Sequence, residues 1–482
     1  MALGEVDYGL MGVVGGLTAF IVFFFNIMSG AVGRFYAIAI GKASVATDMQ
    51  AGLEECRKWF SLAVSIHLVV PVAIVLIGYP IGVWAVENFL TIPPDRVNAC
   101  LWVFRFVCVS SFLGMVSVPF NAMYGAKQYI AELTIYSFVT STLNVVFVYY
   151  MVSHPGVWLV QFALWTCLLS VIPQAIIATR ACWIFPECKF RLAYAWNWQM
   201  YKEMLSYTGW NIFGTLGYLL KGQGISVLVN KYFGPRVNAS MAIANTVSAQ
   251  TMTLTGAVQG AFSPVITTAV GAGDFEKVRA TAFRFCKFGM SLCLLFMLPL
   301  AIELPEVMRL WLKNPPQYVT GLCMIMILIA FIDQNTLGHG VAVMAKGEIK
   351  WYQIILGTFN LLALPIAWMF CALGLNVYYV GLGVLIAWSF LVYGRLYFAR
   401  KLIGMSIRHW LLKIMVPIAI LIVVVVSVGY LPHLFMAASL GRVFATTACC
   451  EFVMLPLLWY VVLDGAEREF VSSRVRKVFH ID

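Results

Sequence analysis

The sequence predicts an all-α polytopic membrane protein, and three observations support this fold class. Of the 482 residues, 62% are hydrophobic and only 11% are charged, whereas soluble domains carry about 25% charged residues. The apolar residues gather in continuous runs, each long enough for the roughly 20 residues that cross a bilayer as a helix. These runs do not show the alternating segments of about 10 residues that are typical of membrane β-barrels.

Thirteen such runs follow one another along the chain, and each is predicted to form a membrane-spanning helix. The predicted helices cover residues 10–33, 59–86, 100–120, 129–151, 157–179, 206–229, 237–269, 282–302, 318–345, 352–373, 377–398, 409–430 and 439–463. The seventh run is unusually rich in Ser and Thr.

The distribution of basic residues predicts the orientation of these helices. Connections after odd-numbered helices, together with the C-terminal tail, hold 24 of the 32 Lys and Arg residues, and the other connections hold 6. The first group includes Arg34, and also Arg395, which is counted with the connection that follows its predicted helix, 377–398. Arg105 and Lys221 are counted as lying inside predicted helices. Because basic residues collect on the cytoplasmic side, this asymmetry predicts a cytoplasmic C-terminus.

The two halves of the chain contain an internal repeat. With a shift of 230 residues and no gaps, glycines coincide at 4 and 234, 30 and 260, and 41 and 271. The next pair of helices also shares a proline, at Pro71 and Pro299. Parallel repeats of six helices are typical of transporters.

The repeat pairs the first predicted helix with the seventh, so the sixth helix, 206–229, has no counterpart in the first half. We therefore expect a further helix ahead of Met1, missing through truncation or a late start codon, and a true thirteen-helix protein is the alternative.

The expected organisation is an N-lobe (1–180), a cytoplasmic linker (181–204), a C-lobe (205–400), two extra C-terminal helices (401–463) and a cytoplasmic tail (464–482).

Several segments resemble one transporter superfamily. The opening LGEVDYGLMGVVGG, the segment GRFYAIAIGK, and FGPRVNASMAIA with SPVITTAVGAGDFEKV are similar to the polysaccharide-exporter branch of the multidrug/oligosaccharidyl-lipid/polysaccharide exporter superfamily, which includes O-antigen type flippases. The resemblance implies two six-helix lobes forming a V around a central cavity, in a bacterial inner membrane. It also implies export of an oligosaccharide linked to polyprenyl pyrophosphate, by alternating access of the two lobes.

Charged residues inside the bilayer are costly and tend to face a cavity or a partner. Lys221 interrupts the apolar run GTLGYLLKGQGISVLV, and with Arg34 and Arg105 it is our candidate for binding a pyrophosphate. Such a role suits cations, since Arg offers a bidentate fork and Lys a compact charge. Arg284 and Lys287 are candidates for a cationic cavity entrance, although interfacial anchoring is the alternative. For Lys221 and Arg105 the competing interpretation is snorkelling toward the interface, and for Arg34 it is anchoring at the cytoplasmic side.

Polar and acidic residues within the helices supply further candidates. Amides could contact sugars, although each could equally form an interhelical hydrogen bond. Asp333 could bind a coupling Na⁺ or H⁺ or pair with Lys221, and the run from Asp333 to Gly340 predicts a break in the ninth helix. Glu451 has no assigned role. The amide candidates are Asn26, Asn211, Asn245, Gln259, Gln334 and Asn335.

No motif indicates an enzyme, a metal site or a cofactor. The chain has no Walker loop, dinucleotide fingerprint, HExxH or GxSxG motif, and no zinc-like Cys and His spacing.

A cation-coupled multidrug antiporter and a peptidoglycan-precursor flippase are the alternative functions within transport, and a membrane glycosyltransferase or polymerase is the alternative outside it. The expected partners are the lipid-linked oligosaccharide and anionic lipids, with Na⁺ or H⁺ as candidate coupling ions and glycosyltransferases or a polymerase as candidate protein partners. No nucleic acid is expected.

Overall fold

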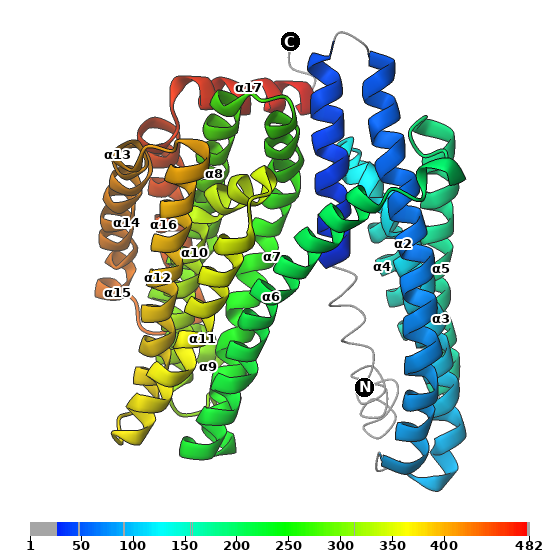
Figure 1. Cartoon of the computed structure of the whole chain (residues 1–482). Coiled ribbons are helices and arrows are strands. Elements are labelled where there is room, and N and C mark those ends of the chain that lie inside the picture. Colours follow the sequence, from blue (N-terminus) through cyan, green and yellow to red (C-terminus); the bar gives the residue numbers. More distant parts are fainter. Residues whose placement is uncertain are drawn as a thin grey trace. The chain divides into compact units, whose positions relative to one another are not determined.

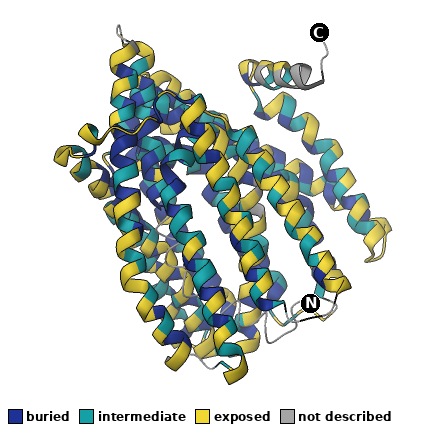
Figure 2. Ribbon diagram, turned by 90° about the vertical axis from the view of Figure 1, so that its right-hand side faces the viewer, coloured by how far each residue is buried: buried dark blue, intermediate teal, exposed yellow. Residues whose placement is uncertain are grey.

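A computed structural model describes residues 27–479 except 47, 48, 90, 91, 155, 157 and 313, and these residues form an all-α protein (Figure 1). The helical fold class predicted from the sequence is therefore confirmed. Among the described residues, eleven helices are long and apolar enough to cross a membrane. Their exposed faces carry many large apolar side chains, and single helices show both exposed and buried residues along their length (Figure 2).

Two predicted spans differ from the structure. The first prediction, 10–33, falls mostly outside the described residues, and the helix that is described there extends over 27–45. The seventh prediction forms a helix, α7 (Pro235–Gly271), but it is not among the eleven apolar spans. Its Ser, Thr, Asn and Gln residues explain the difference, because they lower the mean hydropathy without preventing helix formation.

The chain divides into two compact units. Unit 1 extends to Ile212 and includes Thr267–Gly273, and unit 2 contains Phe213–Ile266 and Asp274–Asp482. Unit 1 contains the helix at 27–45 and most of the first half of the chain. Its labelled helices are α2 (Met49–Trp84), α3 (Val97–Ala126), α4 (Ile130–Ser153), α5 (Leu159–Ile184) and the start of α6 (Trp198–Phe233).

Unit 2 holds the remaining helices. The long ones are the rest of α6, most of α7, α8 (Phe275–Ile302), α10 (Val319–Lys346), α11 (Lys350–Ala372), α12 (Val377–Ile403), α14 (Val416–Gly429) and α16 (Leu440–Leu457). The short ones are α9 (Leu304–Leu312), α13 (Ile407–Trp410) and α15 (Leu431–Phe435), and α17 (Gly465–Phe479) runs at a steep angle to the long helices of its unit (Figure 1).

Local signals in the sequence place several helix ends. Asp274 caps α8 by accepting a hydrogen bond from the backbone N–H of Lys277 at 2.9 Å, and Ser439 caps α16 in the same way. Gly347 and Gly404 follow α10 and α12 with φ angles of 94° and 68°. A glycine adopts this left-handed conformation without the steric cost of a Cβ, so it ends each helix cleanly.

The repeat is visible as a reciprocal contact within unit 1. A Cβ atom on Gly41 would lie 2.0 Å from the backbone oxygen of Thr268, and one on Gly271 would lie 2.3 Å from that of Ile38. Since 38 and 268, like 41 and 271, are related by the shift of 230, equivalent residues exchange equivalent contacts. The repeated glycines thus allow the helix at 27–45 and the end of α7 to approach closely.

The predicted break in the ninth helix is wrong. The α10 helix is continuous from Val319 to Lys346 and passes through Asp333 and both glycines. The glycines serve packing instead, because a Cβ on Gly338 would lie 2.5 Å from the backbone oxygen of Ala282 and one on Gly340 would lie 2.9 Å from the Tyr352 hydroxyl. Tertiary contacts compensate for the low helix propensity of glycine at these positions.

Candidate functional site

The candidate site is a cavity of about 780 Å³ in unit 2, formed by α6, α7, α10 and α12. This volume falls in the range of roughly 300–1,000 Å³ that is usual for ligand pockets. No carboxylate belongs to the described lining, and Lys221 is its basic residue. Besides Tyr218 and Trp388, the polar lining side chains are amides and hydroxyls, from Gln223, Ser226, Asn238, Asn245, Ser248 and Thr253.

Lys221 is held between two aromatic rings of the cavity wall. Its ammonium lies 3.7 Å from the ring centroid of Trp388 and 4.5 Å from that of Tyr218, and only 7% of the residue is exposed. Tyr218 is one turn before Lys221 on α6, whereas Trp388 comes from α12. A cation over aromatic faces is stabilised by the ring quadrupole, so the two rings hold the charge inside the cavity wall.

Trp388 also connects Lys221 to a buried ion pair. Its indole N–H donates to Oδ1 of Asp333 at 3.3 Å, and Nη1 of Arg395 donates to the same oxygen at 2.6 Å. The side chains of Asp333 and Arg395 are 11% and 13% exposed. Asp333 therefore forms its ion pair with Arg395 and not with Lys221, which the sequence offers as a partner. The indole of Trp388 lies between the carboxylate and the lysine.

Sequence reasoning missed Trp388, Tyr218 and Arg395. The charge distribution groups Arg395 with the cytoplasmic basic residues, but Arg395 lies inside α12, a candidate membrane span, and is largely buried. One signal could have found it, because an aspartate in an apolar helix requires a cationic partner from another helix. Tyr218 could have been found from its position one helical turn before Lys221.

Arg34 and Asn211 come together in unit 1. The Arg34 guanidinium carbon lies 4.5 Å from the ring centroid of Tyr207 and 5.0 Å from that of Phe35. The Tyr207 side chain in turn hydrogen-bonds with Asn211, which is 8% exposed. Arg34 is half-buried, so this cluster presents a cation on an aromatic surface within unit 1.

Arg105 does not belong to the lining of the Lys221 cavity. Its Nε donates to the Tyr79 hydroxyl at 3.2 Å, and its guanidinium lies 4.7 Å from the ring centroid of Trp102. Trp102 is 43% exposed. An arginine between a tyrosine and an exposed tryptophan has the contacts of an interfacial anchor.

Lys287 forms ion pairs within unit 2. Its ammonium lies 2.8 Å from Oε2 of Glu467 and 3.5 Å from Oδ2 of Asp464, and it is 5% exposed. These acids form a capping arrangement at the start of α17, so Lys287 fastens α17 to α8. Burial favours a higher pKa for Asp464, but the Glu467 backbone N–H and the Lys287 ammonium hold that pKa below its usual value. Arg284 is half-buried on α8.

The remaining amide candidates lie in different surroundings. Asn245 lines the cavity, whereas Gln334 is buried and donates to the Thr255 hydroxyl at 3.0 Å. Asn335 is also buried, and its backbone oxygen accepts from the indole N–H of Trp410 at 3.1 Å. Gln259 is exposed on α7, and Asn26 lies outside the described residues.

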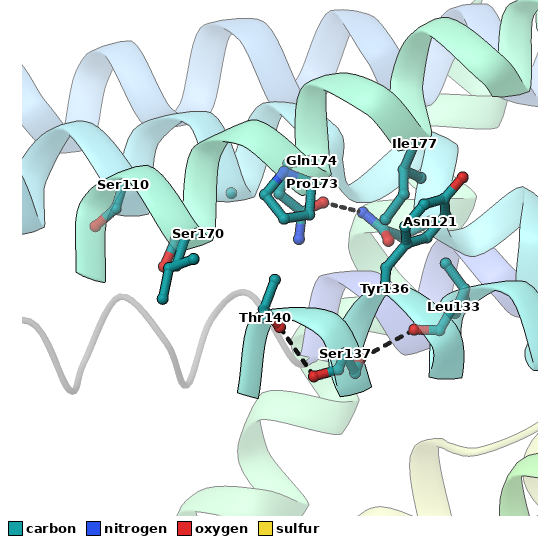
Figure 3. Close-up of a pocket in the computed structure, with 12 residues that line it drawn as sticks. Ser110, Asn121, Leu133, Tyr136, Ser137, Thr140, Ser170, Pro173, Gln174 and Ile177 are labelled. Carbon is teal, nitrogen blue, oxygen red and sulfur yellow. Dashed lines mark hydrogen bonds between the residues drawn. The ribbon is translucent and has the colours of Figure 1, made fainter. Parts of the chain in front are cut away.

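A second hollow, the α4–α5 groove, lies in unit 1 and was not predicted. It has a volume of about 350 Å³ and is lined by α3, α4 and α5 (Figure 3). The Gln174 side-chain oxygen accepts from Asn121 at 2.6 Å and from Ser117 at 2.8 Å. No charged side chain belongs to its described lining, which distinguishes it from the Lys221 cavity.

Comparison with known proteins agrees with this architecture. Residues 212–369 match the MatE family model, and a search of curated proteins gave no match. A MOP-superfamily transporter from Pyrococcus furiosus, described as having a binding pocket of reversed polarity that suggests a different function, is 15% identical, with a TM-score of 0.67 over 84% of this chain and 92% of its own. The fold is that of the MOP-superfamily transporters.

Two further MOP-type structures support the same assignment. An outward-facing multidrug resistance MATE transporter is 15% identical, with a TM-score of 0.69 over 84% of this chain and 90% of its own. A MATE protein in complex with MaL6 is 17% identical, with a TM-score of 0.67 over 84% and 91% of the two chains. The chain is thus a multi-pass membrane protein with a MOP transporter fold, and its matches are with transporters rather than enzymes.

Proposed function

We propose that this protein is a flippase that moves an oligosaccharide linked to polyprenyl pyrophosphate from the inner to the outer leaflet. One observation carries the proposal: the cavity of unit 2 contains the buried cation Lys221 and no described carboxylate. A cation enclosed by protein attracts a diphosphate more strongly than the same cation in water. The amides and hydroxyls around it suit the hydroxyl groups of a sugar.

The same charge distribution disfavours a cationic drug as substrate. Lys221 would repel a positive ligand, and the described lining offers no carboxylate to attract one. The Pyrococcus furiosus transporter is described as having a binding pocket of reversed polarity, which supports a proposal in which pocket charge differs between proteins of this fold. The multidrug function of the MATE structure makes a drug antiporter the second candidate, and the peptidoglycan precursor remains an alternative lipid substrate.

The proposed transport is driven outward without a nucleotide site. Moving two negative charges through an inside-negative potential releases about 4.6 kcal/mol per 100 mV. Alternating access of the two lobes would expose the cavity to each side in turn. The membrane is proposed to be the bacterial inner membrane, with the C-terminus in the cytoplasm.

The test is the double variant Lys221→Ala and Arg34→Ala in cells that depend on this protein for surface polysaccharide. We expect surface polysaccharide to be lost while the protein still inserts into the membrane, because both cations are removed. Lys231→Ala is the matched control, since Lys231 is on the same helix but exposed and outside the cavity lining. Normal polysaccharide in the double variant would refute the flippase proposal, and drug sensitivity of the same cells would support the antiporter.

A further inference from the structure

The segment that links α5 to α6 is held as a fixed part of unit 1. The backbone N–H of Arg191 donates to Oγ of Ser61 at 3.1 Å, and Nη2 of Arg57 donates to the backbone oxygen of Pro186 at 3.0 Å. Because Ser61 and Arg57 belong to α2, these contacts fix which linker side chains point inward and which point outward. The buried linker residues are Phe185, Glu187, Cys188 and Ala195.

The outward side of the linker and the adjoining helix ends expose large aromatic and apolar side chains. Trp183 in the last turn of α5 is 87% exposed, Trp196 is 86% exposed, and Trp198 at the start of α6 is 78% exposed. Phe190 and Leu192 between them are also exposed. Large apolar side chains that are exposed together in one short segment mark an interaction surface.

Basic residues accompany these aromatic side chains. Nζ of Lys58 lies 5.7 Å from the ring centroid of Tyr194, and the guanidinium carbon of Arg191 lies 5.8 Å from the same centroid. Both cations are exposed and border one ring, so a single anionic group can reach both. Lys189 adds a third exposed cation. The Tyr194 hydroxyl donates to the carboxylate of Glu54, and the three cations exceed the charge of this acid. We call the exposed residues from 183 to 198, together with Lys58, the linker surface.

The linker surface lies where the helices of unit 1 leave the apolar part of the membrane. The linker joins the end of one candidate span, Leu159–Ile184, to the start of the next, Trp198–Phe233. Lys58 is near the start of a third span, Gln50–Asn88. Tryptophan and tyrosine favour the headgroup level of a bilayer, and basic residues next to a membrane are attracted to anionic lipids. The residues of the linker surface thus share the depth at which phospholipid headgroups lie.

A lipid surface accounts for these residues better than a protein partner does. Tryptophan and arginine are also enriched in protein interfaces, but a protein interface requires one contiguous patch. Lipid surrounds a membrane protein, so residues contact headgroups wherever they share the right depth. The exposed tryptophans belong to the end of α5, the segment that follows and the start of α6, which is the distribution that a common depth predicts.

We propose that the linker surface binds the headgroup of an anionic phospholipid, with Lys58 and Arg191 at the phosphate and the exposed tryptophans in the surrounding headgroup layer. A zwitterionic phospholipid carries a compensating positive charge, so the surface prefers an anionic one. The ligand belongs to the membrane and not to the cargo. The proposal therefore does not depend on the substrate that the protein transports.

The first experiment measures lipid retention by the full chain, purified from mixed micelles of phosphatidylglycerol and phosphatidylcholine. Native mass spectrometry counts the molecules of each lipid that stay bound. We expect Lys58→Gln with Arg191→Gln to reduce retained phosphatidylglycerol several-fold and to leave retained phosphatidylcholine unchanged. The matched control is Arg400→Gln with Lys401→Gln, which removes two exposed basic residues at the end of α12, and we expect it to leave the retention of both lipids unchanged.

The second experiment measures the depth of the tryptophans with the full chain in bilayers. A fluorescent amino acid replaces Trp196, or Phe138, which is 71% exposed on α4. We expect a lipid with a nitroxide at its headgroup to quench position 196 more strongly than aqueous iodide does. A lipid with a nitroxide in its acyl chain should instead quench position 138 most strongly, which calibrates the depth.

Two outcomes of the retention measurement would overturn the proposal. Unchanged phosphatidylglycerol in the Lys58 and Arg191 variant would show that these cations do not bind the headgroup. Equal loss in the two double variants would show that general charge, and not this surface, retains the lipid. Quenching of position 196 by iodide alone would also overturn the proposal, because the linker surface would then face water and be available to a protein partner.

Discussion

The α4–α5 groove of unit 1 and the α11–α12 surface of unit 2 occupy equivalent places in the repeat but differ in what they hold. The first is uncharged, and its polar groups are amides and hydroxyls. The second is covered by α6, which brings Lys221 against Trp388. The order of helices is thus common to the two halves, whereas the buried charge that defines a candidate binding site is present on one of these two surfaces.

The difference shows how a repeat can acquire a specific function. The apolar pattern that forms the helices is shared, because any helix in a bilayer needs it. A buried charge needs a partner or a cage, and therefore several coordinated residues on different helices. Lys221, Trp388 and Asp333 come from three helices, so the site depends on tertiary structure and not on the repeat pattern alone.

The largest expected effect comes from removing one member of the buried ion pair. We expect Asp333→Ala to lower the free energy of unfolding by about 3–5 kcal/mol, because Arg395 would be left as an unpaired buried charge. Reversible denaturation in mixed micelles would measure the change.

The matched comparison is Glu55→Ala in unit 1. Glu55 pairs with Lys42 at 2.8 Å, but the two side chains are 37% and 54% exposed. Because water screens an exposed pair, we expect a change of about 0–1 kcal/mol. Similar losses in the two variants would contradict the interpretation that burial gives the Asp333–Arg395 pair its larger effect.

The sequence predicted the helices better than it predicted the site. Long apolar runs identify helices without knowledge of their neighbours, and a lysine inside such a run is conspicuous, so Lys221 could be found. Trp388 could not be selected, because a tryptophan in a membrane helix is common and its contacts with Lys221 and Asp333 arise only in the folded chain. The error in α10 has a similar cause, since Gly338 and Gly340 resemble helix breakers until the groups packed against them are known.

A second test addresses the equivalence of the two repeats at their point of contact. We expect Gly41→Ala and Gly271→Ala each to destabilise the protein by about 1–3 kcal/mol, because the new methyl group would overlap backbone atoms of the facing helix. Gly33→Ala is the control on the same helix, since a Cβ there meets no atom within 4 Å. Unfolding measured on all three variants would show whether equivalent glycines have equivalent effects, and a neutral Gly271→Ala would argue against reciprocal packing.

The smallest effect is expected at Trp388, whose two contacts can be separated. Trp388→Phe keeps an aromatic face for Lys221 but removes the N–H donor to Asp333, whereas Trp388→Leu removes both. Since a cation–π contact is worth about 0.5–2 kcal/mol, we expect export of polysaccharide to fall further in the leucine variant than in the phenylalanine variant. Trp368→Phe is the control, because Trp368 is 54% exposed on α11.

Export and protein abundance in the membrane should be measured together for these variants. If the phenylalanine variant loses as much export as the leucine variant at equal abundance, the hydrogen bond to Asp333 matters more than the ring over Lys221. If neither variant differs from Trp368→Phe, the contact of Trp388 with Lys221 has no part in transport. Transport would then depend on the charge of Lys221 and not on its contact with α12. The α4–α5 groove and the α11–α12 surface would then differ only in the presence of α6 and its lysine.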